Sequence, residues 1–149
     1  FILAALNEES LENWIWTNNK SIPKGFIKIT NKENNKTIVV FKRTIDDNYE
    51  SYYDSKNTNK IKNKNELLII MNEFYRDEIL IQKNNYANLK ISKANWFDIL
   101  FNSNWKHPNP SVSLIFKITI ISFILGIISI IIGLIPTFNA LFICIKNNY

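Results

Sequence analysis

The chain has 149 residues, a formal net charge of +5 and 46% hydrophobic residues. This length leaves room for one soluble domain of about 105 residues ahead of an apolar C-terminal run, and it excludes a second independent core. The single cysteine, Cys144, lies in that run, so an intrachain disulfide is excluded. Heavy use of Asn, Ile and Lys indicates a low-GC coding bias, from which we infer a bacterial source.

The N-terminal segment Ile2–Trp16 has apolar residues at roughly helical spacing with acids between them, and we interpret it as an amphipathic helix. Its apolar start, Phe1–Leu6, is too short for the core of a secretory signal and lacks a basic region, so we expect no signal peptide. We therefore expect a cytoplasmic N-terminal domain and a C-terminal helix that is inserted after synthesis, as in a tail-anchored protein. Three lysines before the apolar run, against Lys146 alone after it, agree with the positive-inside rule.

Two runs of β-branched and aromatic residues with interleaved charges follow, at Phe26–Thr30 and Thr37–Ile45. The segment between them is rich in asparagine, which tolerates positive φ, so the pattern predicts a β-hairpin. The next segment, Asp46–Asn65, is polar and turn-prone. We expect a long loop there, with at most one short strand or helical turn.

The following stretch predicts a strand, a short helix and a second strand, at Glu66–Ile70, Asn72–Leu80 and Leu89–Ile91. Ala94–Trp105 then predicts a second amphipathic helix or an interfacial segment, which the prolines of Lys106–Pro110 end. Two roles stay open for the tryptophans at positions 96 and 105. They lie at the headgroup level of a membrane, or they cap the core of the domain.

One part of this stretch carries a family resemblance. The sequence IMNEFYRDEILI at Ile70–Ile81, followed by NLKI at Asn88–Ile91, resembles the repeated unit of swapped-hairpin and double-psi barrels. In that unit a strand leads into a short helix carrying an arginine, then a leucine-isoleucine stop and a second strand. Asn72 stands in place of the family's helix-starting proline, and Asn84 with its neighbour in place of its Gly-Asp turn. The resemblance implies a small β-barrel rather than an open sheet.

No charged residue lies between Lys117 and Lys146. As a helix, this uncharged run is long enough to cross a bilayer. Small residues recur inside this run at alternating steps of three and four, at Thr119, Ser122, Gly126, Ser129 and Gly133. Such a row lets helices approach closely in lipid. Three interpretations remain: the packing face of a dimer or higher oligomer, the lining of a narrow lumen between four or more helices, and a chance pattern. Pro136 either kinks the helix or ends it.

The predicted fold class is thus α+β, a small β-barrel-like soluble domain with flanking short helices plus one C-terminal transmembrane helix. We divide the chain into a cytoplasmic, β-rich, sensor-like domain (1–105), a proline-containing linker (106–113), a transmembrane helix (114–145) and a short tail (146–149).

The residues of the soluble part do not predict catalysis. The only histidine, His107, lies in the linker, so the usual zinc sites are excluded within one chain. The sequence has no Ser-His-Asp set, no nucleophile elbow and no P-loop. We interpret the acid pairs Asp46-Asp47 and Asp77-Glu78 as solvated surface charges, because a catalytic pair must converge in a pocket. We expect no enzymatic activity, no metal and no cofactor.

The basic and aromatic stretch Lys42–Lys64 is the best candidate for ligand binding. Aromatic faces stack with bases, lysines attract phosphates, and the planar fork of an arginine suits phosphate oxygens. The alternative is a mobile, solvated loop. The candidate ligand-binding residues are Lys42, Arg43, Tyr52, Tyr53, Lys62, Lys64 and Arg76.

A sensor-like domain joined to one assembling helix resembles, in layout, the small membrane effectors of bacterial anti-phage systems. The channel-type Hailong effectors, which respond to DNA oligomers, are one such family. The resemblance implies a homo-oligomer, such as a tetramer, in the inner membrane, with a cytoplasmic domain that binds a nucleotide or oligonucleotide and controls a channel-like bundle. The alternatives are a tail-anchored adaptor that binds a protein partner, and a membrane subunit of a larger hetero-complex.

Overall fold

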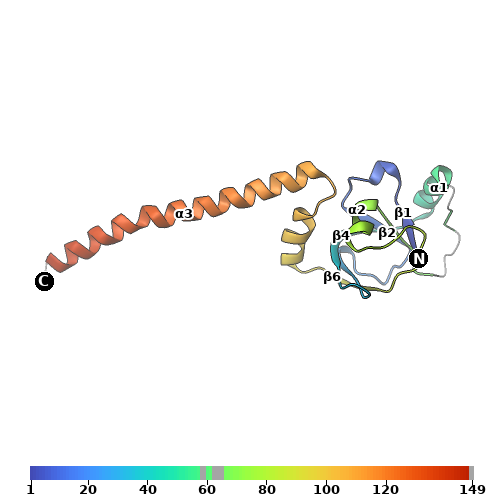
Figure 1. Cartoon of the computed structure of the whole chain (residues 1–149), viewed down its shortest axis with the longest axis horizontal. Coiled ribbons are helices and arrows are strands. Elements are labelled where there is room, and N and C mark those ends of the chain that lie inside the picture. Colours follow the sequence, from blue (N-terminus) through green and yellow to red (C-terminus); the bar gives the residue numbers. More distant parts are fainter. Residues whose placement is uncertain (58–59, 62–65, 148–149) are drawn as a thin grey trace. The chain divides into compact units, whose positions relative to one another are not determined.

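The computed structural model describes residues 1–57, 60–61 and 66–147, and side chains as far as Pro136. Two compact units are present, Phe1–Ser113 and Leu114–Tyr149. The first unit contains one six-stranded sheet, which curls into an open half-barrel with short helices around it, so the predicted α+β class is confirmed (Figure 1).

The sheet has the strand order β1-β5-β2-β4-β3-β6. Its strands are β1 (Ile2–Ala4), β2 (Trp14–Thr17), β3 (Gly25–Asn31), β4 (Thr37–Thr44), β5 (Ile69–Met71) and β6 (Leu89–Lys93). Two pairs are parallel, β1 with β5 and β2 with β4, and the other three are antiparallel.

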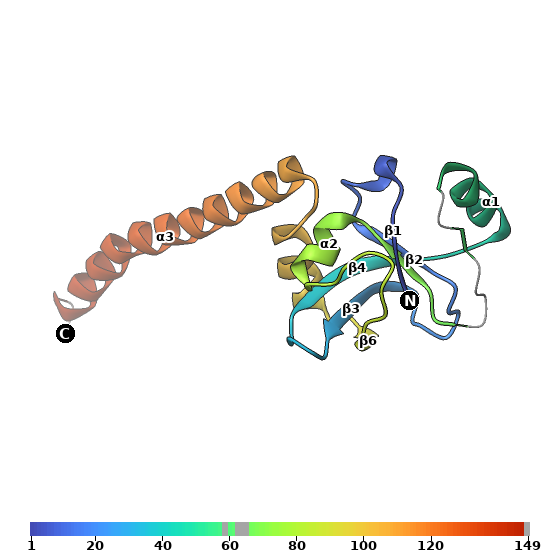
Figure 2. The same cartoon turned by 45° about the vertical axis from the view of Figure 1, so that its right-hand side comes forward.

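The hairpin predicted from the alternating runs is confirmed as β3 and β4, which pair from Thr30 with Thr37 to Gly25 with Lys42. Asn35 in the connecting turn has a φ of 59°, a conformation that asparagine adopts at low cost. Figure 2 shows the hairpin and β6, which pairs with the other edge of β3. The hairpin with the most regular sequence pattern thus lies within the sheet, with β2 on one side of it and β6 on the other.

Two apolar cores lie on the two faces of the sheet. Along β5, Ile69 and Met71 belong to one core and Ile70 to the other, as the period of two in a strand requires. The helix α2 (Glu73–Glu78) covers the first core, beside β4 in Figure 2, and α1 (Asp47–Lys56) covers the second. Because both faces are covered, all three residues of β5 are buried.

The helix predicted at Ile2–Trp16 is wrong. This segment forms β1, a single 3₁₀ turn η1 (Asn7–Glu9) and β2. The spacing of its apolar residues also fits a strand, in which successive side chains point to opposite faces. Ile2 belongs to one core and its neighbour Leu3 to the other. Pairing with β5 and β4, which the local sequence does not reveal, decides between the two periods.

The loop predicted at Asp46–Asn65 is also only partly right, because ten of its residues form α1. Asp46 caps this helix, its Oδ1 accepting a hydrogen bond from the Tyr49 N–H at 2.7 Å. Tyr49 and Tyr53, four positions apart, are its buried residues.

Helical structure within Ala94–Trp105 is confirmed, but its centre is a π-helix, η2 (Asp98–Ser103). The helical structure ends before the prolines, as predicted. The next helix, α3 (Pro110–Asn147), begins at Pro110 and continues through Pro136. Its segment Pro110–Pro136 is long and apolar enough to cross a membrane, with a mean hydropathy of 2.9. No residue in the most apolar part of this segment is buried by the rest of the chain. The protein therefore has the layout of a single-pass membrane protein.

Candidate functional site

Two of the predicted ligand-binding residues lie inside the fold. Lys42 is 6% exposed, and its Nζ donates to the Ile22 carbonyl at 2.8 Å. Burial lowers the pKa of Lys42. Tyr53 is 1% exposed and donates to the Ala4 carbonyl at 2.7 Å, and burial raises its pKa to about 12. The polar groups of both side chains are thus bound within the fold. Lys62 and Lys64 lie outside the described residues.

Arg43 and Tyr52 lie nearer the surface but are already engaged. The Arg43 guanidinium lies 3.6 Å from the centroid of the Trp14 ring, a cation–π contact. The Tyr52 hydroxyl donates to Glu8 at 2.6 Å. The structure thus does not gather the basic and aromatic residues of this stretch around one cavity.

Beside Arg43, a cluster that the sequence did not reveal is centred on Glu9. Its carboxylate accepts hydrogen bonds from the indole N–H groups of Trp14 and Trp16, at 3.2 and 2.6 Å, and from the Tyr49 hydroxyl at 2.9 Å. The Tyr49 and Trp16 rings stack with centroids 3.7 Å apart. Burial, with the Glu9 carboxylate beside it, raises the pKa of Tyr49. This cluster ties η1, β2 and α1 together.

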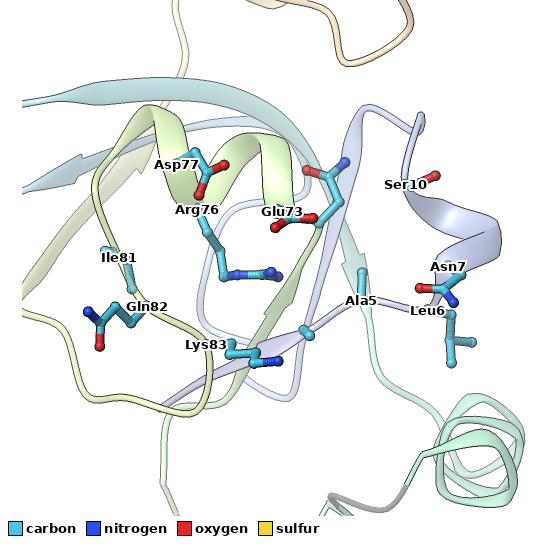
Figure 3. Close-up of a pocket in the computed structure, with 12 residues that line it drawn as sticks. Ala5, Leu6, Asn7, Ser10, Glu73, Arg76, Asp77, Ile81, Gln82 and Lys83 are labelled. Carbon is cyan, nitrogen blue, oxygen red and sulfur yellow. The ribbon is translucent and has the colours of Figure 1, made fainter.

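Arg76, by contrast, forms part of the wall of a cavity of about 620 Å³. The cavity is lined by the end of β1, η1, α2 and the residues after α2 (Figure 3). Its polar lining includes Asn7, Ser10 and Lys83, and two carboxylates, Glu73 and Asp77. The cavity thus offers both cations and acceptors to a small polar ligand.

Arg76 is 7% exposed, and its Nη1 donates to the Met71 carbonyl at 2.7 Å. In the described part of the chain, no carboxylate lies within 4.0 Å of its guanidinium. Figure 3 shows the side chain reaching from α2 towards the segments that carry Ala5 and Lys83. A buried cation needs acceptors close to it, and the Met71 carbonyl supplies one.

The backbone around the cavity is held firmly. Asn72 caps α2, its Oδ1 accepting from the Tyr75 N–H at 3.0 Å, while its Nδ2 donates to the Glu12 carbonyl at 2.9 Å. Burial raises the pKa of Tyr75, whose hydroxyl also bonds to Asn13. These contacts fix α2 against the segment that precedes β2.

At its other end, α2 closes with a Schellman motif. The Ile81 N–H bonds to the Arg76 carbonyl at 2.8 Å and the Leu80 N–H to the Asp77 carbonyl at 3.1 Å. This motif needs a left-handed residue, and Leu80 takes that place with a φ of 54°. A bulky residue in this conformation is strained, and such strain occurs preferentially at functional sites. The turn returns the chain to the cavity at Ile81 and Lys83.

The residues predicted to pack or to line a pore all lie in α3. The Thr119 and Ser129 hydroxyls donate to carbonyls four residues earlier, those of Ile115 and Leu125, each at 2.9 Å. A Cβ added at Gly126 or Gly133 would meet no atom within 4 Å. The row that also includes Ser122 is therefore open on the isolated helix.

Among the described residues, no group of three His, Cys, Asp or Glu side chains could hold a metal ion. The Nδ1 of His107 accepts a hydrogen bond from the Asn109 N–H at 3.0 Å, and burial lowers the pKa of this histidine. Comparisons with protein-family models, curated proteins and solved structures found no match.

Proposed function

We propose that this chain is a single-pass membrane protein that assembles with copies of itself through the small-residue row of α3, under the control of a ligand bound beside Arg76. The observation that carries the proposal is that row, five small residues at alternating steps of three and four on an open apolar helix. A period of 3.5 residues keeps one face in register with a partner helix and gives left-handed packing.

The support for self-assembly is physical. Lipid removes the hydrophobic drive between helices, so association depends on close backbone approach and on hydrogen bonds across the interface. Gly126 and Gly133 leave open space for such an approach. Thr119 and Ser129 direct their hydrogens to their own helix, but their oxygens keep acceptor capacity for a neighbouring helix.

The support for a ligand comes from the cavity of the first unit. A nucleotide or another small phosphate-bearing molecule would present its anion to Arg76 and Lys83, and its hydroxyl or amino groups to Glu73. The proposal includes a channel-like bundle of four or more helices in the inner membrane, with the first unit in the cytoplasm, as in the anti-phage effectors whose layout the chain resembles.

The test is the oligomeric mass of the purified chain in detergent. Gly126→Leu with Gly133→Leu should lower the mass to that of a monomer. The matched control, Ile124→Leu with Ile131→Leu, changes the same helix away from the row and should leave the oligomer intact. A monomeric wild-type chain, or an oligomer that survives the glycine changes, contradicts the proposal.

Conduction and ligand control need separate measurements. Dye release from vesicles should occur with the wild-type chain and be lost with the double glycine variant. Lys83→Glu should reduce any response of this release to nucleotides, because it reverses one of the two charges that face the anion. An oligomer that never releases dye would favour the tail-anchored adaptor instead.

A further inference from the structure

The first unit carries an aromatic surface that neither the cores nor the cavity uses. Its four residues are Trp96, Phe97, Phe101 and Trp105, which are 64%, 63%, 40% and 45% exposed. The Trp96 and Phe97 rings meet edge to face at 4.5 Å, and those of Phe97 and Phe101 lie nearly parallel at 6.3 Å. Large apolar side chains that gather on one exposed surface mark an interaction site.

The two tryptophans of this surface lie apart from the cores. Neither Trp96 nor Trp105 belongs to one of the two cores of the described residues. The two tryptophans thus do not pack within either core.

The segment that bears the aromatic surface is anchored from its other side. Asp98 is 9% exposed and pairs with the Lys28 Nζ of β3 at 3.0 Å. Ser103 is 1% exposed and accepts a hydrogen bond from the Asn13 Nδ2 at 2.6 Å. Burial by itself would raise the pKa of Asp98, but the hydrogen bonds from Lys28 and from the Asn95 N–H outweigh it and lower this pKa. The polar side of the segment thus faces the sheet, which leaves the rings outward.

The aromatic surface is also close along the chain to the start of the apolar helix. The Ser113 hydroxyl, on a residue that is 8% exposed, donates to the Trp105 carbonyl at 2.7 Å. Ser113 already lies in the first turn of α3 and within its candidate membrane span, Pro110–Pro136. A surface joined to a membrane span by so few residues cannot move far from the headgroup region.

We propose that the aromatic surface docks on the interface of the lipid bilayer and holds the first unit against the membrane. Tryptophan and phenylalanine are suited to this layer, where rings contact the acyl chains and the indole N–H stays near water. Lys93 and Lys106, exposed on either side of the segment, would face the headgroups. Lys106 already pairs with Glu78 at 2.6 Å, so its charge is partly compensated there.

The occupant is lipid rather than a second copy of the chain because the segment that bears the surface ends only a few residues before Pro110, where the candidate span begins, and the bilayer must surround that span. The docking adds a second membrane contact that does not depend on the assembly of α3. It therefore goes beyond the proposed function, and it can hold where self-assembly fails.

Tryptophan fluorescence tests this proposal directly, because all four tryptophans lie in the first unit, at positions 14, 16, 96 and 105. The full chain is placed in vesicles of phosphatidylcholine brominated just below the headgroups, and in unbrominated vesicles of the same lipid. We expect bromine to reduce the emission roughly twofold, because two of the four rings would lie at that depth. The variant Trp96→Phe with Trp105→Phe should lose this quenching, while Trp14→Phe should retain it.

Equal emission in the two lipids, or unchanged quenching in the double variant, would overturn the proposal. A second variant, Phe97→Ser, keeps every tryptophan and should weaken the quenching by loosening the contact. If the quenching instead falls as the amount of protein per vesicle rises, another copy of the chain covers the surface in place of lipid, and the proposal is overturned. The oligomeric mass, measured on the same samples, separates this result from the fate of the proposed function.

Discussion

Glu9 offers the sharpest test of how the first unit is held together, because one carboxylate accepts three side-chain hydrogen bonds. Glu9→Ala leaves the indoles of Trp14 and Trp16 and the hydroxyl of Tyr49 without this acceptor. Each bond to a charged acceptor contributes about 1 kcal/mol here, since the groups are only partly buried. The variant should therefore lose about 3 kcal/mol of unfolding free energy.

The assay is thermal unfolding of the purified chain in detergent, followed by tryptophan emission. For a unit of this size, 3 kcal/mol corresponds to a fall in Tm of roughly 10–20 °C. Glu9→Gln, which keeps a carbonyl acceptor but no charge, should cost about 1 kcal/mol.

The neighbouring Glu8 supplies the matched control. It accepts a hydrogen bond from the exposed Tyr52 and lies 3.9 Å from Lys56. Exposed contacts of this kind contribute little, so Glu8→Ala should shift the unfolding free energy by less than about 0.5 kcal/mol. If Glu9→Ala is no more damaging than Glu8→Ala, the three bonds do not hold η1, β2 and α1 together.

Two further predictions concern the cavity and the anchor of the aromatic surface. Leu80→Gly should raise the unfolding free energy by about 0.5 kcal/mol, because relief of the left-handed strain exceeds the cost of the larger conformational entropy that glycine has in the unfolded chain. Leu80→Ala keeps a Cβ in the same conformation and should bring no gain. Chemical denaturation measures both changes. The folded-state pKa of Asp98 lies below its ordinary value of 3.8, so its carboxylate stabilises the fold above that pH, and this stabilisation is lost as the pH falls through the folded value. Asp98→Asn should therefore flatten the fall in Tm below about pH 4, and an unchanged acid profile would contradict this assignment.

The sequence predicted those parts of the fold whose signal is local. The hairpin of β3 and β4 follows from alternation around an asparagine-rich turn, and α3 follows from its unbroken apolar run. The segment Ile2–Trp16 did not reveal its fold, because its apolar spacing fits a helix and two strands alike. Only the partner strands, far away in the sequence, distinguish these alternatives.

Of the predicted ligand-binding residues that the structure describes, Arg76 alone lines the cavity. The arginine of the predicted short helix is thus at the cavity, whereas Lys42 is buried, because strand alternation turns its stem inward, towards the Ile22 carbonyl. Lys83, which lines the cavity, and the left-handed Leu80 beside it were not predicted, since neither stands in a recognisable motif. The signal that would have found them is the Ile-Leu-Ile stop after α2, which predicts a tight return of the chain.

The pairing of β1 with β5 has a consequence for how the protein is made. Ile2 pairs with Ile69, a residue synthesised 67 positions later. At ordinary translation rates β1 waits roughly 3–13 s for its partner strand. During that interval an apolar strand edge of the nascent chain stays open to other chains, and contacts of such long range also slow folding itself. Binding of chaperones to the nascent chain should accordingly be strongest before β5 emerges.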